Sequence, residues 1–335
     1  MTPIRRKLVI VLAIGAPILL ALLYGAAWTI LADRWRAGLA SWIAAQAENG
    51  WTVTTGDMAV TGFPGPIRLT LAQPALRDAL GNAWRGPPLT LSISLWRPLT
   101  PGFTAAGTHR IVLAGATPVE IVAGGLTGTV TIADRRPVAL SAKGENLSGP
   151  GIALAGLSLE IDRPPPIADA PVPTLATARL DLDRLTLPPG FPLPLDQTVN
   201  AVHVASRLRG AWPDGKGRDA LATWRDGGGT IDLDSFDIAW PPLDVAGNAT
   251  LALDGDLQPE LAGTVDVRGG GDAVDRAVAA HMMDKNGAII AKLALTIASK
   301  PTGDGGTAAR VPISVQKRVL SLGPVPVWQV PEVTW

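Results

Sequence analysis

Histidine and aspartate are the residue types in this chain best suited to acid–base or metal chemistry, but their spacing suits neither. The three histidines are His109, His203 and His281, and none has a second His, Asp or Glu four residues away, as a helical metal motif requires. His203 alternates with valines, which places it on the polar side of a strand, and His281 falls on the apolar side of a predicted helix. We therefore expect no catalytic histidine.

Two Asp-x-Asp pairs and a glycine triplet are the remaining candidates for ligand binding. Asp181 with Asp183, and Asp232 with Asp234, each share one face of a predicted strand and could offer oxygens to a cation. No third ligand type lies near them, so we expect solvated carboxylates. Residues 269–271, Gly-Gly-Gly, could cradle a phosphate at a helix start, but they lack the Lys and Ser/Thr of a phosphate loop. The sequence thus predicts no metal, no cofactor and no catalytic residue.

The composition narrows the class of protein further. There is no cysteine, which excludes disulfides, thiolate metal sites and cysteine nucleophiles. Lys plus Arg and Asp plus Glu each number 29, so there is no basic field to attract nucleic acid. Charged residues make up 17% of the chain, against about 25% in a usual soluble domain, and apolar residues make up 47%. The apolar excess must be buried or exposed for a purpose.

The N-terminus predicts a membrane-spanning helix. Residues 5–7, Arg-Arg-Lys, precede an uncharged apolar run over residues 8–31, and a helix of that length covers about 36 Å, enough for a hydrocarbon core of about 30 Å. The basic residues place segment 1–7 in the cytoplasm and the rest of the chain outside. A cleaved signal peptide, with residues 25–27, Gly-Ala-Ala, as the small-residue site, is the alternative.

Helical spacing of apolar residues continues past this run, so residues 32–50 are expected to extend the same helix as an amphipathic segment. The stripe would either pack on the following domain or contact lipid, with its tryptophans at the interface. Its members are Trp28, Leu31, Trp35, Leu39, Trp42 and Ile43.

Residues 51–335 predict a mainly β, periplasmic domain. Apolar and small polar residues alternate over residues 89–95 and in many similar runs, which Gly- and Pro-rich turns separate. We expect an elongated, curved antiparallel sheet with a few short helices. These helices are a short turn at 219–224, a helix at 273–283 capped by Asp272, and residues 288–299, whose pattern also allows a strand. Five prolines in residues 163–175 mark a linker or edge loop that could divide the domain.

The strand pattern also predicts an apolar groove. Residues 179–187 and 230–238 align without gaps, which suggests a sheet built from similar units. If the apolar face of such a sheet curls without closing, it becomes a groove. The expected lining comes from two runs that should face one interior, the second with a bulge at Ser235: Leu91, Ile93, Leu95, Ile231, Leu233 and Ile238. Most of the 11 tryptophans are expected in the core, and a minority at the groove or the bilayer.

Several short motifs, in their order and spacing, resemble those of one family. They are Gly50-Trp51, Gly62-Phe63-Pro64, Trp96-Arg97-Pro98, Trp224-Arg225-Asp226-Gly227-Gly228, residues 251–254 with 257–261, and Leu322-Gly323-Pro324. The chain resembles the domain-of-unknown-function family 2125 of Gram-negative envelope proteins over nearly its whole length. That family has no established activity, so the resemblance implies no catalytic residue. It is distantly similar to AsmA-like proteins, which implies an inner-membrane anchor, a β-rich body and a role in lipid traffic or outer-membrane homeostasis.

Together these observations predict a single-pass protein of the bacterial inner membrane, with a cytoplasmic N-terminus and most of the chain in the periplasm. We expect it to be non-enzymatic and to maintain the envelope by shielding or conveying lipid acyl chains. Its expected partners are the inner membrane, acyl chains and envelope proteins, and not nucleic acid. A scaffolding protein with a closed core is the alternative, and a hydrolase with an unrecognised site is a third hypothesis. An open or a filled apolar face distinguishes the first two.

Overall fold

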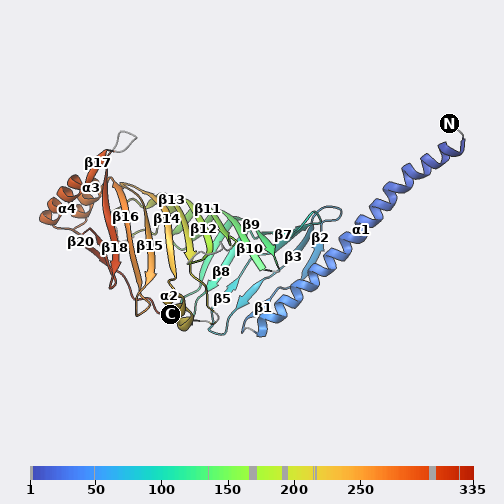
Figure 1. Cartoon of the computed structure of the whole chain (residues 1–335), viewed down its shortest axis with the longest axis horizontal. Coiled ribbons are helices and arrows are strands. Elements are labelled where there is room, and N and C mark those ends of the chain that lie inside the picture. The colour runs from blue at the N-terminus through green and yellow to red at the C-terminus, as the bar shows by residue number, and fades with distance from the viewer. Residues whose placement is uncertain are drawn as a thin grey trace. The chain divides into compact units, whose positions relative to one another are not determined.

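The computed structural model describes residues 3–48, 50–134, 136–165, 172–190, 195–213, 215, 217–301, 307–323 and 325–335. Over these residues the chain is mainly β, with a large open antiparallel sheet and few helices after one long apolar N-terminal helix (Figure 1). The predicted fold class is therefore confirmed. The chain divides into two compact units, residues 1–131 and 132–335, called unit 1 and unit 2 below.

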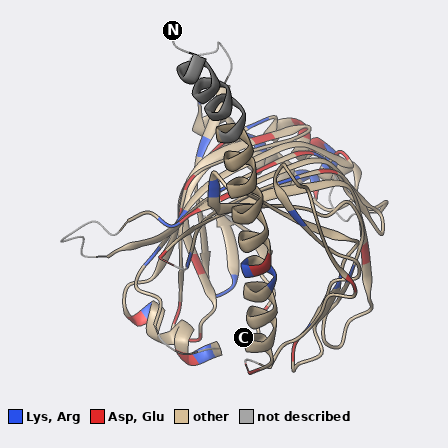
Figure 2. Cartoon of the chain, turned by 90° about the vertical axis from the view of Figure 1, so that its right-hand side faces the viewer, with Lys and Arg blue, Asp and Glu red and all other residues tan. Residues whose placement is uncertain are grey.

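Helix α1 runs unbroken over Pro3–Glu48, which corresponds to about 69 Å of helix. Its described part from Ala16 onward is long and apolar enough to cross a membrane. In the sequence of this helix, Asp33, Arg34 and Arg36 follow the apolar stretch, and Figure 2 shows charged residues partway along it. The apolar stretch before these charged residues and the amphipathic stretch after them thus belong to one helix.

Unit 1 contains two antiparallel ladders that meet on one long strand. The first ladder joins β2 (Met58–Thr61), β3 (Ile67–Leu71), β6 (Leu89–Ser94) and β7 (Arg97–Thr104). The second joins β1 (Thr52–Thr54), β4 (Ala75–Arg77), β5 (Ala83–Arg85) and β8 (Gly107–Val112). Strand β9 (Val119–Ala133) pairs with β8 through its first residues and with β7 further along.

Unit 2 is a meander in which each strand pairs with the next. It begins with β10 (Arg136–Gly149), β11 (Ile152–Asp162), β12 (Thr174–Thr186), β13 (Thr198–Arg209), β14 (Thr230–Trp240), β15 (Leu243–Leu253) and β16 (Pro259–Arg268). It ends with β18 (Thr307–Gln316), β19 (Val319–Leu322) and β20 (Val325–Gln329), while β17 (Ser299–Pro301) pairs with β18.

Two predictions about this sheet can now be compared with its topology. The Pro-rich segment 163–175, part of which lies outside the described residues, connects β11 to β12, and these two strands pair with each other; a subdivision of the domain there stays a prediction. The two similar runs lie in β12 and β14, which flank β13. The register of β14 shifts around Asp234 and Ser235, where a bulge was expected.

Three short helices belong to unit 2: α2 (Gly217–Asp226), α3 (Gly270–Ala279) and α4 (Lys285–Ala298). The region 288–299 is thus helical, and Asp284 caps it by accepting a hydrogen bond from the Gly287 amide. The prediction for 273–283 is wrong at both ends. Gly269, in the left-handed conformation, precedes α3 in place of an Asp272 cap.

The C-terminus of α3 also differs from the expected one, and the reason is local. The amides of His281 and Met282 bond to the carbonyls of Val278 and Ala277, which is the bonding pattern of a Schellman motif. His281 takes the left-handed position (φ 59°) that glycine usually fills. Its side chain is exposed, so it does not lie on an apolar helix face.

Among the described residues, two clusters of buried side chains stand out, one in each unit. In unit 1, Trp28 and Ala32 of α1 are buried against Ile67 and Ile93 of the sheet. The first part of the stripe, Trp28, Leu31 and Trp35, therefore packs on the domain, which was one of its two expected roles, whereas Trp42 is exposed. In unit 2, Trp224 of α2 packs with Leu253 and Leu257, with Ile231 beside them; partly buried Leu208, Leu221 and Ala222 complete the cluster.

The tryptophans depart from the expectation that most lie in the core. Only Trp28 and Trp224 of the 11 are buried. Six are exposed: Trp42, Trp51, Trp96, Trp212, Trp328 and Trp335. Exposed aromatic rings can mark interaction sites, so the position of each ring on the molecule bears on its role.

Candidate functional site

The predicted groove residues fall into two separate environments. Ile93 is buried under α1 and Leu95 packs beside it, while Leu91 is half-buried opposite Phe103 of β7. In unit 2, Ile231 belongs to the Trp224 cluster, and Leu233 and Ile238 of β14 are half-buried. The structure does not bring the two sets into one cluster, and a groove common to both stays a prediction.

An apolar cleft in unit 1 is the strongest candidate for a binding site. Its volume is about 690 Å³. One wall is the apolar stretch of α1, through Leu20, Leu23, Tyr24, Ala27 and Leu31. The other wall is the β6–β7 turn, through Leu95, Trp96 and Pro98. Of the predicted groove residues, only Leu95 lines this cleft.

The β2–β3 turn holds α1 next to the cleft. The Trp28 indole Nε1 donates a hydrogen bond of 2.9 Å to the Gly65 carbonyl, and the Tyr24 hydroxyl donates to the Pro64 carbonyl. The Phe63 ring meets Trp28 edge-on, with ring centroids 5.6 Å apart. These contacts fix residues 24–28 of α1 on unit 1.

The turn itself depends on one glycine. Gly62 has a φ of 114°, and a Cβ there would lie 2.0 Å from the Pro66 carbonyl oxygen. No other residue fits without opening the turn. The Gly-Phe-Pro motif of the sequence thus forms the turn that contacts α1.

The three histidines lie in different environments in the structure. The ring of His109 is buried and stacks on Trp84; its Nε2 lies 3.1 Å from the Ala105 carbonyl oxygen and its Nδ1 3.4 Å from the Trp84 indole nitrogen. His203 is exposed, and its Nδ1 lies 2.7 Å from an oxygen of Asp181 on the neighbouring strand. His109 belongs to unit 1, and the other two, His203 on β13 and His281 after α3, belong to unit 2.

Three of the four Asp-x-Asp carboxylates contact basic side chains of the strand between them. Strand β13 presents basic side chains to both β12 and β14, a neighbourhood that the sequence alone does not reveal. The pairs are Asp181 with His203, Asp232 with Arg209 at 3.3 Å, and Asp234 with Arg207. Asp232 and Asp234 are therefore ion-paired, and Asp181 is hydrogen-bonded to His203. Within the described residues, no group of three or more His, Asp or Glu is arranged to hold a metal ion.

Ion pairing also shifts the pKa values of two side chains in unit 2. Arg310 of β18 makes two hydrogen bonds to Asp266 of β16, at 2.8 and 2.7 Å, and this contact lowers the pKa of Asp266. The Asp234 carboxylate likewise raises the pKa of Arg207. Because these side chains are largely exposed, their contribution to stability is small.

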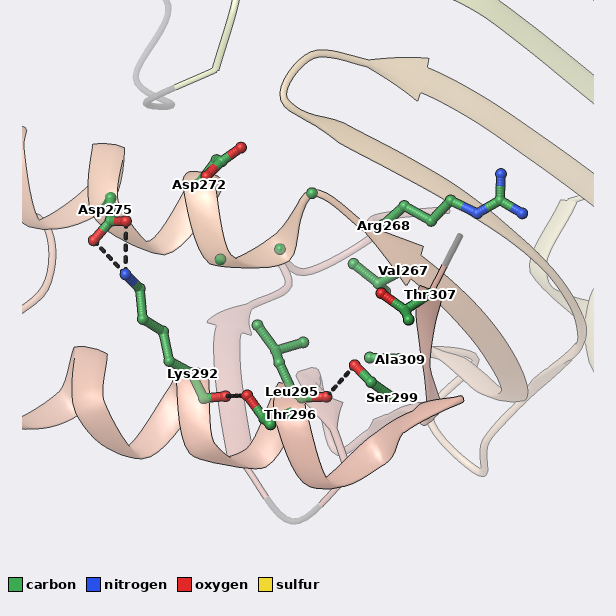
Figure 3. Close-up of a pocket in the computed structure, with 13 residues that line it drawn as sticks. Val267, Arg268, Asp272, Asp275, Lys292, Leu295, Thr296, Ser299, Thr307 and Ala309 are labelled. Atoms are coloured by element: carbon green, nitrogen blue, oxygen red, sulfur yellow. Dashed lines mark hydrogen bonds and ion pairs between the residues drawn. The ribbon is translucent and has the colours of Figure 1, made fainter. Parts of the chain in front are cut away.

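A second, smaller pocket of about 290 Å³ lies between α3 and α4 (Figure 3). The glycine triplet lines it, but for a steric reason: a Cβ on Gly269 would lie 1.7 Å from the Pro242 carbonyl oxygen, and one on Gly270 2.9 Å from Leu295. Lys292 is engaged by both carboxylate oxygens of Asp275, each at 2.6 Å. The pocket therefore has acidic side chains of its own and offers little to a phosphate.

Other sequence motifs build the core of unit 2. The Trp224 indole donates to the Arg209 carbonyl, and Arg225 donates to the carbonyls of Asp254 and Gly255. The C-terminal segment then folds back: the amide group of the buried Gln258 exchanges hydrogen bonds of 3.0 and 2.9 Å with the Val333 backbone. These motifs stabilise the fold of unit 2. The hydrogen bonds between Gln258 and the C-terminal segment were not predicted from the sequence.

Comparison with known proteins identifies the family of this chain but no individual relative. No curated protein matches the chain. No solved structure matches it either. The family model described as "Uncharacterized protein conserved in bacteria (DUF2125)" matches residues 28–331, which is most of the chain. The protein therefore belongs to the DUF2125 family of bacterial proteins of unknown function.

Proposed function

We propose that this protein is a single-pass inner-membrane protein that binds a lipid acyl chain in the apolar cleft beside α1, and so takes part in envelope maintenance without catalysing a reaction. The segment before α1's apolar stretch is then cytoplasmic and the β units lie in the periplasm. The observation that carries the proposal is that one wall of the cleft belongs to the helix able to span the membrane.

Retention of α1 as an anchor is supported by its packing. A signal peptidase that cut after Ala27 would remove four of the five helix residues that line the cleft. It would also remove the Tyr24 contact to Pro64. Trp28, at the new N-terminus, is only 8% exposed and would be left without the preceding helix. Cleavage would thus destroy the cleft, whereas an anchor preserves it.

The chemistry of the cleft favours an acyl chain as the ligand. Its lining is aliphatic and aromatic, with the Tyr24 hydroxyl already engaged. A volume of about 690 Å³ falls in the range of about 300–1,000 Å³ that small-molecule pockets occupy. Since Leu20 and Leu23 would lie in the bilayer, lipid chains that surround α1 can enter the cleft without crossing water.

Filling the cleft tests the proposal. Both alanines are exposed, but Ala27 lines the cleft and Ala26 does not, so Ala27→Trp and Ala26→Trp form a matched pair. Native mass spectrometry of the full chain in mild detergent should show a bound phospholipid in the wild type and in Ala26→Trp, and lose it in Ala27→Trp. Equal lipid in all three proteins, or none in the wild type, would refute lipid binding in this cleft.

A scaffolding role is the second candidate, and one surface favours it. Helix α4 exposes an apolar stripe at four-residue spacing, formed by Ile289, Leu293 and Ile297. In a scaffold, Leu293→Lys would abolish the function in cells and leave the bound lipid of the Ala27 experiment unchanged. If Leu293→Lys supports normal growth under envelope stress at normal abundance, the stripe has no such role.

A further inference from the structure

We propose that two turns of unit 1, residues 62–66 and 94–99, insert into the interfacial layer of the membrane that α1 enters. They are called the paired turns below. This inference rests on the proposed anchor and adds a second membrane contact, made by the β structure itself. The partner is the phospholipid bilayer.

The register of the sheet places the paired turns side by side. Strand β3 begins directly after the first turn and β6 ends in the second, and Ile67 pairs with Ile93. Both turns also reach the same stretch of α1. The first contacts Tyr24 and Trp28, and the second forms a cleft with residues 20–31. Because these residues belong to the apolar stretch, the turns lie level with the bilayer surface.

The side chains of the paired turns suit that position. Trp96 is 82% exposed and Phe63 59% exposed, and Leu99 is exposed beside them. Exposed apolar side chains that lie together mark an interaction site, and tryptophan is enriched at membrane interfaces. Neither turn contains Asp or Glu, and their single charged residue is Arg97. A guanidinium at this depth matches the phosphate of a lipid headgroup.

The backbone of the first turn needs little water. Pro64 and Pro66 have no N–H group to satisfy. The Gly65 amide donates to the Gly62 carbonyl at 2.6 Å. The carbonyls of Pro64 and Gly65 accept hydrogen bonds from α1 side chains. Each of these satisfied or absent polar groups lowers the cost of placing the turn in a region poor in water.

The absence of native cysteine allows a direct depth measurement. Trp96→Cys and Leu99→Cys, each labelled with the fluorophore NBD, report the paired turns. Leu80→Cys is the matched control, because Leu80 is 79% exposed in a turn beside Ala79, whose Cβ faces Gly50 just beyond the far end of α1. From residue 24 to its end at residue 48 the helix rises about 36 Å. Leu20→Cys serves as the label within the span.

The labelled full chains are reconstituted in nanodiscs of phosphatidylethanolamine and phosphatidylglycerol. We expect blue-shifted emission at positions 96 and 99 that brominated lipid quenches, and water-like, unquenched emission at position 80. Water-like emission at 96 and 99, with position 20 in lipid, would overturn the inference and leave the anchor intact. Blue-shifted emission that brominated lipid does not quench would place the labels against protein instead of lipid and also overturn it. Position 20 in water would refute the anchor.

Discussion

Trp28 is the residue through which the structure most clearly joins the apolar helix to the β body. It is 8% exposed, packs in the cluster of Ala32, Ile67 and Ile93, and donates the hydrogen bond to Gly65. Truncation of a buried tryptophan to alanine costs about 3–5 kcal/mol. We expect Trp28→Ala to destabilise unit 1 by that amount and to free α1 from the sheet.

A second tryptophan on the same helix supplies the control. Trp42 is exposed, so Trp42→Ala should change stability by less than about 0.5 kcal/mol. A milder variant, Trp28→Phe, keeps most of the apolar bulk and loses only the hydrogen bond, which is worth about 1 kcal/mol.

Hydrogen–deuterium exchange of the full chain in detergent measures the effect locally. In Trp28→Ala, amide protection should fall in β3 and β6, which pack under α1, and stay unchanged in β12–β14 of unit 2. Trp42→Ala should exchange like the wild type. If β3 and β6 keep their protection in Trp28→Ala, then α1 does not contribute to the core of unit 1, and the argument that its cleavage would destroy the cleft fails.

Three further predictions follow from the cores and the ion pairs. Ile93→Asp buries an unpaired carboxylate under α1 and should destabilise unit 1 by several kcal/mol in chemical unfolding, whereas an unchanged midpoint would mean that the site is open to water. Trp224→Ala should cost about 3–5 kcal/mol, while Trp212→Ala, at an exposed neighbouring ring, should be nearly neutral in the same assay. The pKa of Asp266 is lowered, so its ionised form adds a small stability above its ordinary pKa of about 3.9 that is lost as the pH falls through the lower folded value. Asp266→Asn should therefore lie slightly below the wild type at neutral pH and converge with it in acid, and curves that stay parallel would contradict this assignment.

The sequence predicts the elements well where a single physical pattern dominates. Strict alternation over residues 89–95 locates β6, and the break in alternation at Ser235 marks a real bulge. An uninterrupted apolar and amphipathic pattern predicts one helix through residue 48. These features depend on local periodicity, which neighbouring strands do not alter.

The features that the sequence does not predict depend on contacts between distant segments. Asp272 is a good cap by type, but Gly269 must take a left-handed turn beside Pro242, and this sets the start of α3. Asp181, Asp232 and Asp234 acquire their partners only because β13 lies between β12 and β14.

The candidate site shows the same limit. Leu95 was correctly singled out as apolar, yet the other wall of its cleft is a helix about seventy residues earlier in the chain. Trp96 was expected, like most of the tryptophans, to lie in the core because its side chain is large and apolar. Its exposure follows from its position at the tip of a turn next to α1, which only the assembled unit reveals.

Photo-crosslinking tests the central claim most directly, because it asks where a lipid chain lies. The full protein is reconstituted in nanodiscs with a phospholipid whose acyl chain carries a diazirine, irradiated, digested and mapped by mass spectrometry. The account predicts crosslinks on both walls of the cleft, at residues 20–31 and 95–98, that Ala27→Trp suppresses on the second wall and Ala26→Trp does not. Crosslinks confined to α1, or crosslinks to residues 95–98 that Ala27→Trp leaves unchanged, would contradict a lipid-binding cleft.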